Sequence, residues 1–395
     1  MKRSTERILT THVGSLARSD SLTPLLRLRE EGEPYDREAL ARLVRESVAD
    51  VVRKQVEAGI DIVTDGEQGK SGFFGYIVER FNGFERKPAA PGTVRPRAAG
   101  REYLAFPDYY AWSERIAKPF GGRSGGRGHV VDTCTGPISY KGHAAVQADI
   151  DNLKAAIKGR AHEDVFMPAI ASSYVAATFA NEYYRTHEEY EQAVSDAMRE
   201  EYKAIVDAGF ILQLDDPRLV TYYMMHPELS VADCRKWAAE RVAVINDSIR
   251  DIPPEKVRFH TCYSIDVGPR IHEMNLQDIV DIMLKINAGA YSFEAANPRH
   301  EHEYHVFERV KLPAGKILIP GVISHTTNLV EHPELVAERI LRFAKIVGRE
   351  NVIAGADCGF AASALRFNDT HPSVAWLKFA ALAEGARLAT SELWN

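Results

Sequence analysis

The chain has 395 residues, of which 45% are hydrophobic and 26% charged, with a formal net charge of -6. This composition is typical of a globular protein with a large core, and it gives no general electrostatic reason to bind nucleic acid. The charged N-terminus is not followed by the apolar stretch of a secretory signal, and the longest weakly polar run, 167–180, is too short to span a bilayer. We therefore expect a cytoplasmic protein with neither a nucleic-acid partner nor a membrane anchor.

Short apolar runs alternate with longer amphipathic segments along most of the chain, which is the pattern of βα units. Eight such strands, each followed by a helix, predict an α/β protein that is a single (β/α)8 TIM barrel over 1–395. An open, doubly wound sheet remains the alternative, because periodicity does not distinguish the two. The expected strands are 8–13, 60–64, 166–171, 210–214, 257–260, 290–293, 317–320 and 352–355, and the expected helices include 37–58, 187–208, 230–249, 276–287, 332–347 and 373–388.

One region breaks this alternation. Residues 69–150 are rich in glycine, proline, arginine and aromatic side chains. We expect a long insertion after strand 2 that lies over the barrel mouth. Its glycines do not open a helix directly after a strand, so the pattern does not indicate a dinucleotide or phosphate loop.

Four side chains of the kinds that bind zinc lie at the C-terminal ends of expected strands. They are His260, Cys262, Glu294 and Cys358. The gaps between them match about one and two βα units, so a barrel would bring all four to its C-terminal face, where barrel active sites lie. The alternatives are ordinary core and rim residues, or a closed structural zinc. Two thiolates and a carboxylate would leave a zinc centre with a net charge of about -1, which suits a substrate thiolate better than water activation.

The other two cysteines, Cys134 and Cys234, are expected in the core, since free cysteine is commonly buried.

Seven short motifs, taken in order, resemble the catalytic barrel of cobalamin-independent methionine synthase. The resemblance implies zinc-dependent methyl transfer to homocysteine, with the four side chains named above as zinc ligands. It places Ser15, Glu67 and Asp215 where that family holds the amino-acid substrate, and carboxylates at two strand ends could grip an ammonium group. The motifs are Thr10-Thr11-His12-Val13-Gly14-Ser15, Asp65-Gly66-Glu67, Thr135-Gly136-Pro137, Gln213-Leu214-Asp215-Asp216-Pro217, His260-Thr261-Cys262, Phe293-Glu294 and Ala356-Asp357-Cys358-Gly359.

The chain also departs from the family pattern. It has no room for the second barrel that helps the full-length enzymes bind folate, so the methyl donor is either methyltetrahydrofolate or another compound. His325 follows a shorter motif than the family's proton-donor histidine, and we expect either His325 or Asp216 to protonate the leaving group. Arg299 is a candidate to bind an anionic substrate group, with a salt bridge at a helix start as the alternative.

The expected partners are therefore a small thiol and an alkyl donor. Three other functions stay open at this point. The chain could be another zinc thiol S-alkyltransferase, such as an epoxyalkane:coenzyme M transferase-like enzyme. The resemblance also extends to a superfamily that contains uroporphyrinogen decarboxylase, so the chain could be a metal-free decarboxylase. It could also be a zinc- or thiol-binding module without turnover. The sequence makes no prediction of the oligomeric state.

Overall fold

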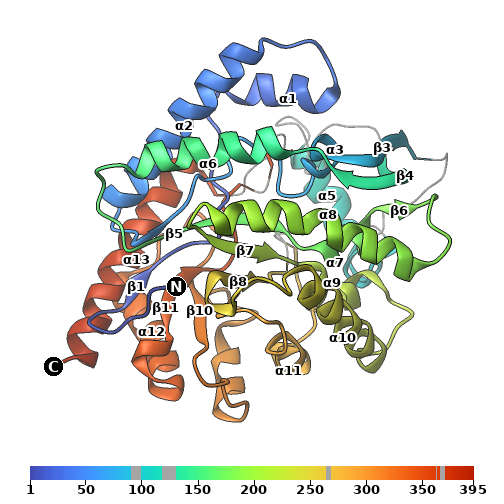
Figure 1. Ribbon diagram of the computed structural model, residues 1–395. Helices are drawn as coiled ribbons and strands as arrows, with labels where there is room; N and C mark the ends of the chain where they lie inside the picture. The colour runs from blue at the N-terminus through green and yellow to red at the C-terminus, as the bar shows by residue number, and fades with distance from the viewer. Residues whose placement is uncertain (90–98, 118–129, 264–267, 362, 365–369) are drawn as a thin grey trace.

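The computed structural model describes residues 1–89, 99–117, 130–263, 268–361, 363–364 and 370–395. Eight parallel strands form a nearly closed barrel, in which each strand lies beside the next barrel strand of the chain (Figure 1). The Asp61 N–H donates to the Thr10 carbonyl at 3.2 Å, which joins the first strand to the second. The predicted (β/α)8 barrel is confirmed. Its strands are β1 (Leu9–Thr10), β2 (Ile62–Val63), β5 (Asp164–Ile170), β7 (Ile211–Asp215), β8 (Val257–His260), β9 (Ala290–Phe293), β10 (Ile317–Ile323) and β11 (Ile353–Ala356).

Helices surround the barrel, and local sequence signals set their ends. Thr186 and Ser230 each begin a helix with a capping box. Gly59 and Gly209 follow helices and adopt φ angles of 83° and 96°, which favour glycine. The helices are α1 (Thr23–Glu31), α2 (Arg37–Glu57), α6 (His143–Ile157), α7 (Ser172–Thr178), α8 (His187–Asp207), α9 (Arg218–Met225), α10 (Val231–Ser248), α11 (Val280–Met283), α12 (Pro333–Val347) and α13 (Pro372–Leu393), with 3-10 turns at Pro254–Lys256, Leu276–Asp278, Glu301–Glu308 and Arg349–Asn351.

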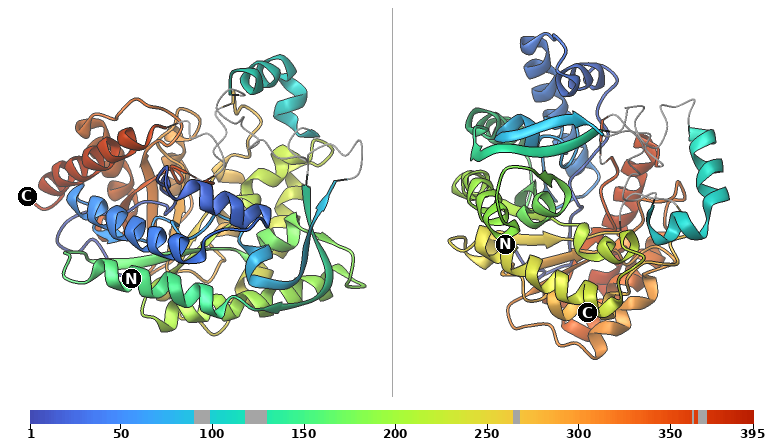
Figure 2. Two further views of the ribbon diagram at one scale, coloured as in Figure 1. Left: turned by 90° about the horizontal axis from the view of Figure 1, so that it is seen from above. Right: turned by 90° about the vertical axis from the view of Figure 1, so that its right-hand side faces the viewer.

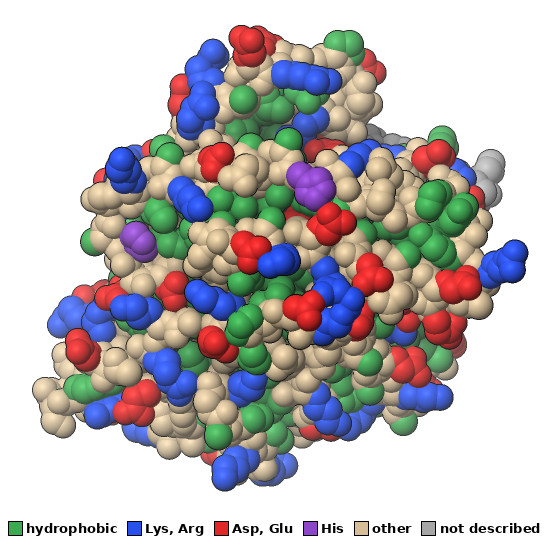
Figure 3. Space-filling model, in the orientation of Figure 1, with side chains coloured by type: hydrophobic (Ala, Val, Ile, Leu, Met, Phe, Trp, Pro, Cys, Tyr) green, Lys and Arg blue, Asp and Glu red, His purple; other side chains and the backbone are tan. Residues whose placement is uncertain are grey.

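Within the described ranges, none of these helices is long and apolar enough to cross a bilayer. On the face drawn in Figure 3, positive and negative side chains are interspersed. One surface ion pair of the chain joins Arg250 to Asp196, 3.2 Å apart.

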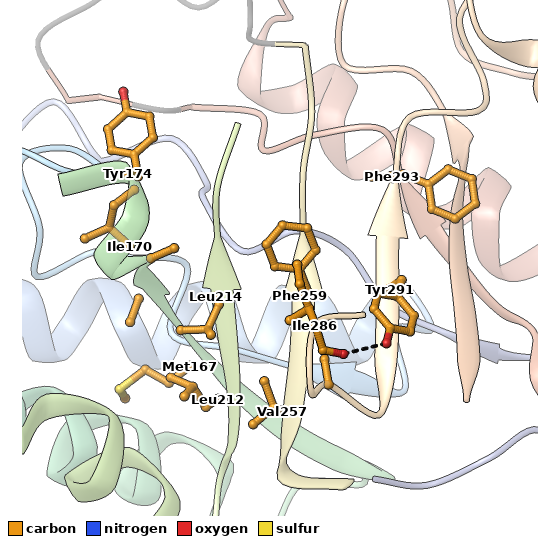
Figure 4. Close-up of a cluster of buried hydrophobic side chains, with 14 of the residues drawn as sticks. Met167, Ile170, Tyr174, Leu212, Leu214, Val257, Phe259, Ile286, Tyr291 and Phe293 are labelled. Atoms are coloured by element: carbon orange, nitrogen blue, oxygen red, sulfur yellow. Dashed lines mark hydrogen bonds between the residues drawn. The ribbon is translucent and has the colours of Figure 1, made fainter. Parts of the chain in front are cut away.

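The helix expected over 276–287 is much shorter in the structure. It is divided into the 3-10 turn Leu276–Asp278 and the single turn α11. The Tyr291 hydroxyl donates to the carbonyls of Leu284 and Ile286 at 3.1 and 2.7 Å, as Figure 4 shows for Ile286. These bonds satisfy carbonyls that a continuing helix would use, so the chain turns early into β9.

Side chains alternate between the two faces of the barrel wall. The outward residues form the large core between strands and helices, part of which Figure 4 shows with Leu212, Leu214 and Phe259. The inward residues near the bottom form a small apolar cluster that includes Ile211. Because the period is two, the inward positions that follow Ile211 are Gln213 and Asp215. The barrel interior therefore changes from apolar to polar toward its C-terminal end.

The insertion after β2 contains two separate parts. The strands β3 (Phe81–Pro88) and β4 (Val130–Tyr140) form an antiparallel hairpin, which the short β6 (Ala180–Asn181) extends. The helices α4 (Arg101–Ala105) and α5 (Pro107–Ala117) lie well away from that hairpin (Figure 2). The Arg101 guanidinium joins α4 to the end of α9 and the chain that follows it by donating to the carbonyls of Tyr223, His226 and Leu229. The turn α3 (Ile77–Arg80) precedes the hairpin.

The predicted range 69–150 extends too far at its end. Residues from His143 onward belong to α6, which packs between α2 and α8 as one of the barrel helices. Val146, Ile150 and Leu153 are its buried residues at helical spacing. This helical periodicity indicates that α6 begins near residue 143, but the glycine-rich composition of the preceding segment obscured it.

Candidate active site

His260, Cys262 and Cys358 meet at the C-terminal end of the barrel. One ligand atom from each lies within 4.8 Å of the others, and all three side chains are buried. His260 ends β8, Cys262 follows it by two residues, and Cys358 follows β11. The barrel closure therefore brings together two distant parts of the chain, and three of the four predicted metal ligands form one group.

The environment of the His260 ring suits a metal ligand. Burial and the nearby Arg258 lower its pKa to about 3, so the imidazole is neutral. Its Nδ1 lies 3.3 Å from the Ser292 hydroxyl, whereas its buried Nε2 has no hydrogen-bond partner among the residues that the structure describes. A buried polar atom without a partner is costly, and a metal would satisfy it. The ring thus fits a metal-binding role.

The two thiols share one hydrogen bond. Cys358 Sγ donates to Cys262 Sγ at 2.9 Å, and neither cysteine forms a disulfide. The hydrogen bond to Cys262, together with burial, raises the pKa of the Cys358 thiol well above its usual range. A divalent cation reverses this preference by stabilising the thiolates. Imidazole with two thiols is a donor set that suits zinc.

Glu294 lies next to this group but is not a member of it in the described chain. Its Oε2 accepts from Arg270 Nη2 at 2.6 Å and from Asn297 Nδ2 at 2.8 Å. Its Oε1 accepts from the Tyr263 backbone N–H at 2.8 Å. Burial opposes the charge, but Arg270 together with His325 and His300 outweighs burial and holds the pKa of Glu294 below its ordinary value. The fourth predicted ligand is therefore an ionised carboxylate bound to protein donors.

Asp357 connects the two strand ends that carry Glu294 and Cys358. Its Oδ1 accepts from the backbone N–H groups of Ala295 and Ala296, both at 2.8 Å, and its Oδ2 accepts from Asn297 at 2.9 Å. Asn297 thus contacts both Glu294 and Asp357. These bonds orient the loop after β9 relative to β11.

Glu67 and Asp215 form a buried carboxylate pair on the same end of the barrel. Burial and the charge of Glu67 raise the pKa of Asp215 well above its usual value, while Lys70 acts in the opposite direction. Asp215 accepts from Gln213 at 2.8 Å, and Glu67 Oε2 has no hydrogen-bond partner within the described ranges. Two carboxylates with few donors around them suit a positively charged ligand group.

Glu67 also has an unusual backbone. Its φ angle is 55°, in the left-handed region that non-glycine residues rarely adopt. Its N–H donates to Asp65 Oδ1 at 2.9 Å, which helps hold this conformation. Strained backbone of this kind is concentrated at functional sites.

Ser15 and Glu67 both contact the Arg18 side chain. The Ser15 hydroxyl donates to the Ala361 carbonyl and accepts from Arg18 Nη1 at 3.2 Å. The buried Arg18 guanidinium also donates to the carbonyls of Ala361, Glu67 and Lys70 at 2.7 to 3.0 Å, and it lies 3.8 Å from Glu67 Oε2. Arg18 therefore connects three loops at the mouth, although nothing in its local sequence marks it.

The two predicted proton donors lie on opposite sides of His260. Asp216 follows β7; the Ser173 hydroxyl and the Leu219 N–H donate to it, and burial raises its pKa to about 6. His325 is buried after β10, and its charge would act on both His260 and Glu294. Both residues thus belong to the same end of the barrel as the thiols.

Arg299 is half-buried in the loop after β9. Its own N–H donates to Asn297 Oδ1 at 3.1 Å, and its buried Nε has no hydrogen-bond partner in the part of the chain that the structure describes. The salt-bridge alternative has no support within those ranges, where no carboxylate lies within 4.0 Å of its guanidinium.

Arg258 is a buried cation that sequence analysis missed. It occupies the inward position two residues before His260 and donates to Thr11 Oγ1 at 3.0 Å and to the His12 carbonyl at 2.7 Å. Its guanidinium lies 3.9 Å from the centre of the Phe166 ring. The period-two alternation of β8 could have predicted its inward direction.

The fold and the site together define a barrel protein with a buried, thiol-rich candidate metal centre at its C-terminal mouth. Residues 171–380, slightly more than half of the chain, match the family model described as the catalytic domain of cobalamin-independent synthase. The chain belongs to this family.

Similar proteins extend the match to nearly the whole chain. The chain is 26% identical over 390 residues to a methionine synthase of Saccharolobus solfataricus, covering 97% of this chain and 95% of that protein. It is 24% identical over 388 residues to a methionine synthase of Thermococcus kodakarensis, covering 97% and 94%. The barrel also resembles a solved B12-independent methionine synthase of a Shewanella species, in complex with selenomethionine, with a TM-score of 0.70, 20% identity and coverage of 98% and 99%. This last likeness supports the fold.

Proposed function

We propose that the protein is a zinc-dependent methyltransferase that transfers a methyl group to the thiol of homocysteine. The observation that carries this proposal is the convergence of His260, Cys262 and Cys358 beside a buried carboxylate pair. Family membership supports methyl transfer to homocysteine, since the matched relatives are named methionine synthases.

His260, Cys262 and Cys358 would hold the zinc, with Glu294 as a fourth and exchangeable ligand. The unpartnered Nε2 of His260 and the two adjacent thiols fit this ion. Bound zinc supplies the positive charge that keeps a substrate thiol ionised and nucleophilic at neutral pH. The loop after β9 orients Glu294 through Asn297 and Asp357.

Glu67 and Asp215 would bind the ammonium group of the substrate. A cation between them would counteract both burial and the repulsion by Glu67, which together raise the pKa of Asp215. Ser15 would assist through its hydroxyl, which Arg18 already positions. Arg299 would bind the substrate carboxylate, because its guanidinium has no carboxylate partner within the described ranges.

A proton donor is needed when the leaving group is a strong base. If the methyl donor is methyltetrahydrofolate, its departing nitrogen must be protonated as the methyl group is transferred. His325 and Asp216 are the two candidates, and the raised pKa of Asp216, about 6, leaves part of this carboxyl protonated in weakly acidic solution. A donor with a neutral leaving group would not need either residue.

A second candidate, an alkyltransferase that uses coenzyme M, is supported by Arg299 alone, since a guanidinium also binds a sulfonate. The cobalt-substituted protein separates the two when its visible spectrum is titrated with homocysteine, 4-mercaptobutyrate and coenzyme M. We expect homocysteine to bind most tightly, because only homocysteine carries an ammonium group for Glu67 and Asp215. A preference for coenzyme M would contradict the homocysteine assignment.

A further inference from the structure

Arg270 reaches the candidate metal centre from outside the regular barrel. It lies in the segment between β8 and β9, in the described range that begins at residue 268. Its Nη2 donates to Glu294 Oε2 at 2.6 Å, while its Nε donates to Glu273 Oε1 at 2.6 Å. One guanidinium therefore binds two buried carboxylates through different nitrogens.

The backbone around Arg270 is held by the insertion. Glu102 of α4 is buried, and its carboxylate accepts from the backbone N–H groups of Arg270 at 3.2 Å and His272 at 2.7 Å. Arg270 itself has a φ angle of 59°, a left-handed conformation that costs energy for a non-glycine residue. Because Glu102 binds the backbone N–H groups of Arg270 and His272, the backbone here is held in place and directs the Arg270 side chain toward Glu294.

Glu273 contacts both Arg270 and His300. Its second oxygen lies 3.0 Å from His300 Nε2, and His300 Nδ1 lies 2.7 Å from Glu303 Oε2. If Glu294 moved away, Arg270 would keep Glu273 as its partner. The departure of Glu294 would therefore leave no bare guanidinium in the protein interior, which removes the usual cost of breaking a buried ion pair.

The charge of the metal centre also permits this exchange. Zinc with two thiolates is formally neutral, and either the Glu294 carboxylate or a substrate thiolate would add one negative charge. Replacing one by the other leaves the net charge of the centre unchanged. The carboxylate then needs a partner outside the centre, and Arg270 is the cation in contact with it.

We propose that Arg270 is a positioning residue. When a substrate thiol replaces the Glu294 carboxylate at the metal, Arg270 binds the released carboxylate. This inference rests on the proposed zinc-thiol function. Arg270 and the metal would compete for one carboxylate, so Arg270 favours thiol binding and weakens retention of the metal by the resting protein. A residue that only supports the fold of the site would strengthen both.

The test uses the full-length, cobalt-substituted protein with Arg270→Met, Glu294→Gln and the double variant. For Arg270→Met we expect homocysteine affinity, followed by the visible spectrum, to fall on the order of tenfold, and the metal to resist a chelator on the order of tenfold better. Adding Glu294→Gln should restore homocysteine affinity, because no carboxylate remains to be released. Arg270→Lys should lie between wild type and Arg270→Met.

The inference would be overturned if Arg270→Met lost metal and the double variant with Glu294→Gln lost it as well. If Arg270→Met does not fold, the variant Arg270→Met with Glu273→Gln, which removes one charge of each sign, is compared with Glu273→Gln alone under the same expectations. If the visible spectrum of the wild-type protein did not change on addition of homocysteine, the proposed function would be contradicted. The chelator comparison would still decide the role of Arg270.

Discussion

The sulfur atoms of Cys262 and Cys358 lie 2.9 Å apart, although 96 residues separate the two cysteines in the chain. The contact exists because β8 and β11 end at the same mouth of a barrel. Neither thiol is bonded as a disulfide, so both are free to bind a metal.

Removing one of these thiols should remove the metal. We expect Cys358→Ser to weaken zinc binding by on the order of a hundredfold or more, since the loss of a ligand exceeds the usual effect of an outer contact. Metal content measured by atomic absorption after dialysis checks this. Cys234→Ser is the matched control, because Cys234 is a buried cysteine of α10 and should leave the zinc in place. A full equivalent of tightly bound zinc in Cys358→Ser would show that the ligand assignment is wrong.

Removing the charge of Glu67 should affect the substrate and not the metal. Glu67→Gln is expected to weaken homocysteine binding by roughly 10- to 100-fold, the range for a lost charged hydrogen bond. Calorimetric titration gives the affinity, and metal analysis should find zinc unchanged. Glu163→Gln changes a half-buried, ion-paired carboxylate and serves as the control. Unchanged affinity in Glu67→Gln would point to a thiol without an ammonium group.

The two candidate proton donors can be distinguished by the leaving group. With methyltetrahydrofolate as donor, replacing the true acid, by His325→Gln or Asp216→Asn, should lower kcat by about 10²- to 10⁴-fold. With a sulfonium donor, whose leaving group is a neutral thioether, the same variant should lose little activity. Zinc content and homocysteine affinity are measured in parallel. An equal loss with both donors would indicate damage to the site and not the loss of an acid.

The network around His300 should make stability depend on pH. Burial opposes the charge of His300, but hydrogen bonds to Glu273 and Glu303 outweigh burial and raise its pKa to about 9. A raised pKa means that folding favours the protonated form. The stabilisation, on the order of 3 kcal/mol, is therefore complete below about pH 6.5 and is lost as the pH rises through about 9.

Urea unfolding at several pH values, with the free energy of unfolding as the readout, checks this dependence. His300→Gln should flatten the decline between about pH 6.5 and 9. His305→Gln, which removes an exposed histidine paired with Glu308 at 3.0 Å, should leave the decline as it is in wild type. A His300→Gln profile parallel to that of the wild type would contradict a charged His300.

Much of the barrel was predictable because short apolar runs alternate with longer amphipathic segments, several of which are followed by a glycine. Within each strand, the alternation of side chains between the two faces places Asp215 and His260 on the inner face, where the strand ends converge. The family motifs then predicted roles for Cys262, Cys358 and Glu67 residue by residue. The insertion boundary was predicted less well, because composition hid the helical periodicity of α6.

Sequence by itself thus determined the fold class and the side chains available at the barrel mouth. Only the tertiary structure decided where those side chains are directed. Glu294 binds Arg270, which lies in a segment without periodicity, and Arg18 joins loops through backbone carbonyls that any sequence would supply. Such contacts depend on the positions of segments that are distant in the chain, which local patterns of hydrophobicity do not encode.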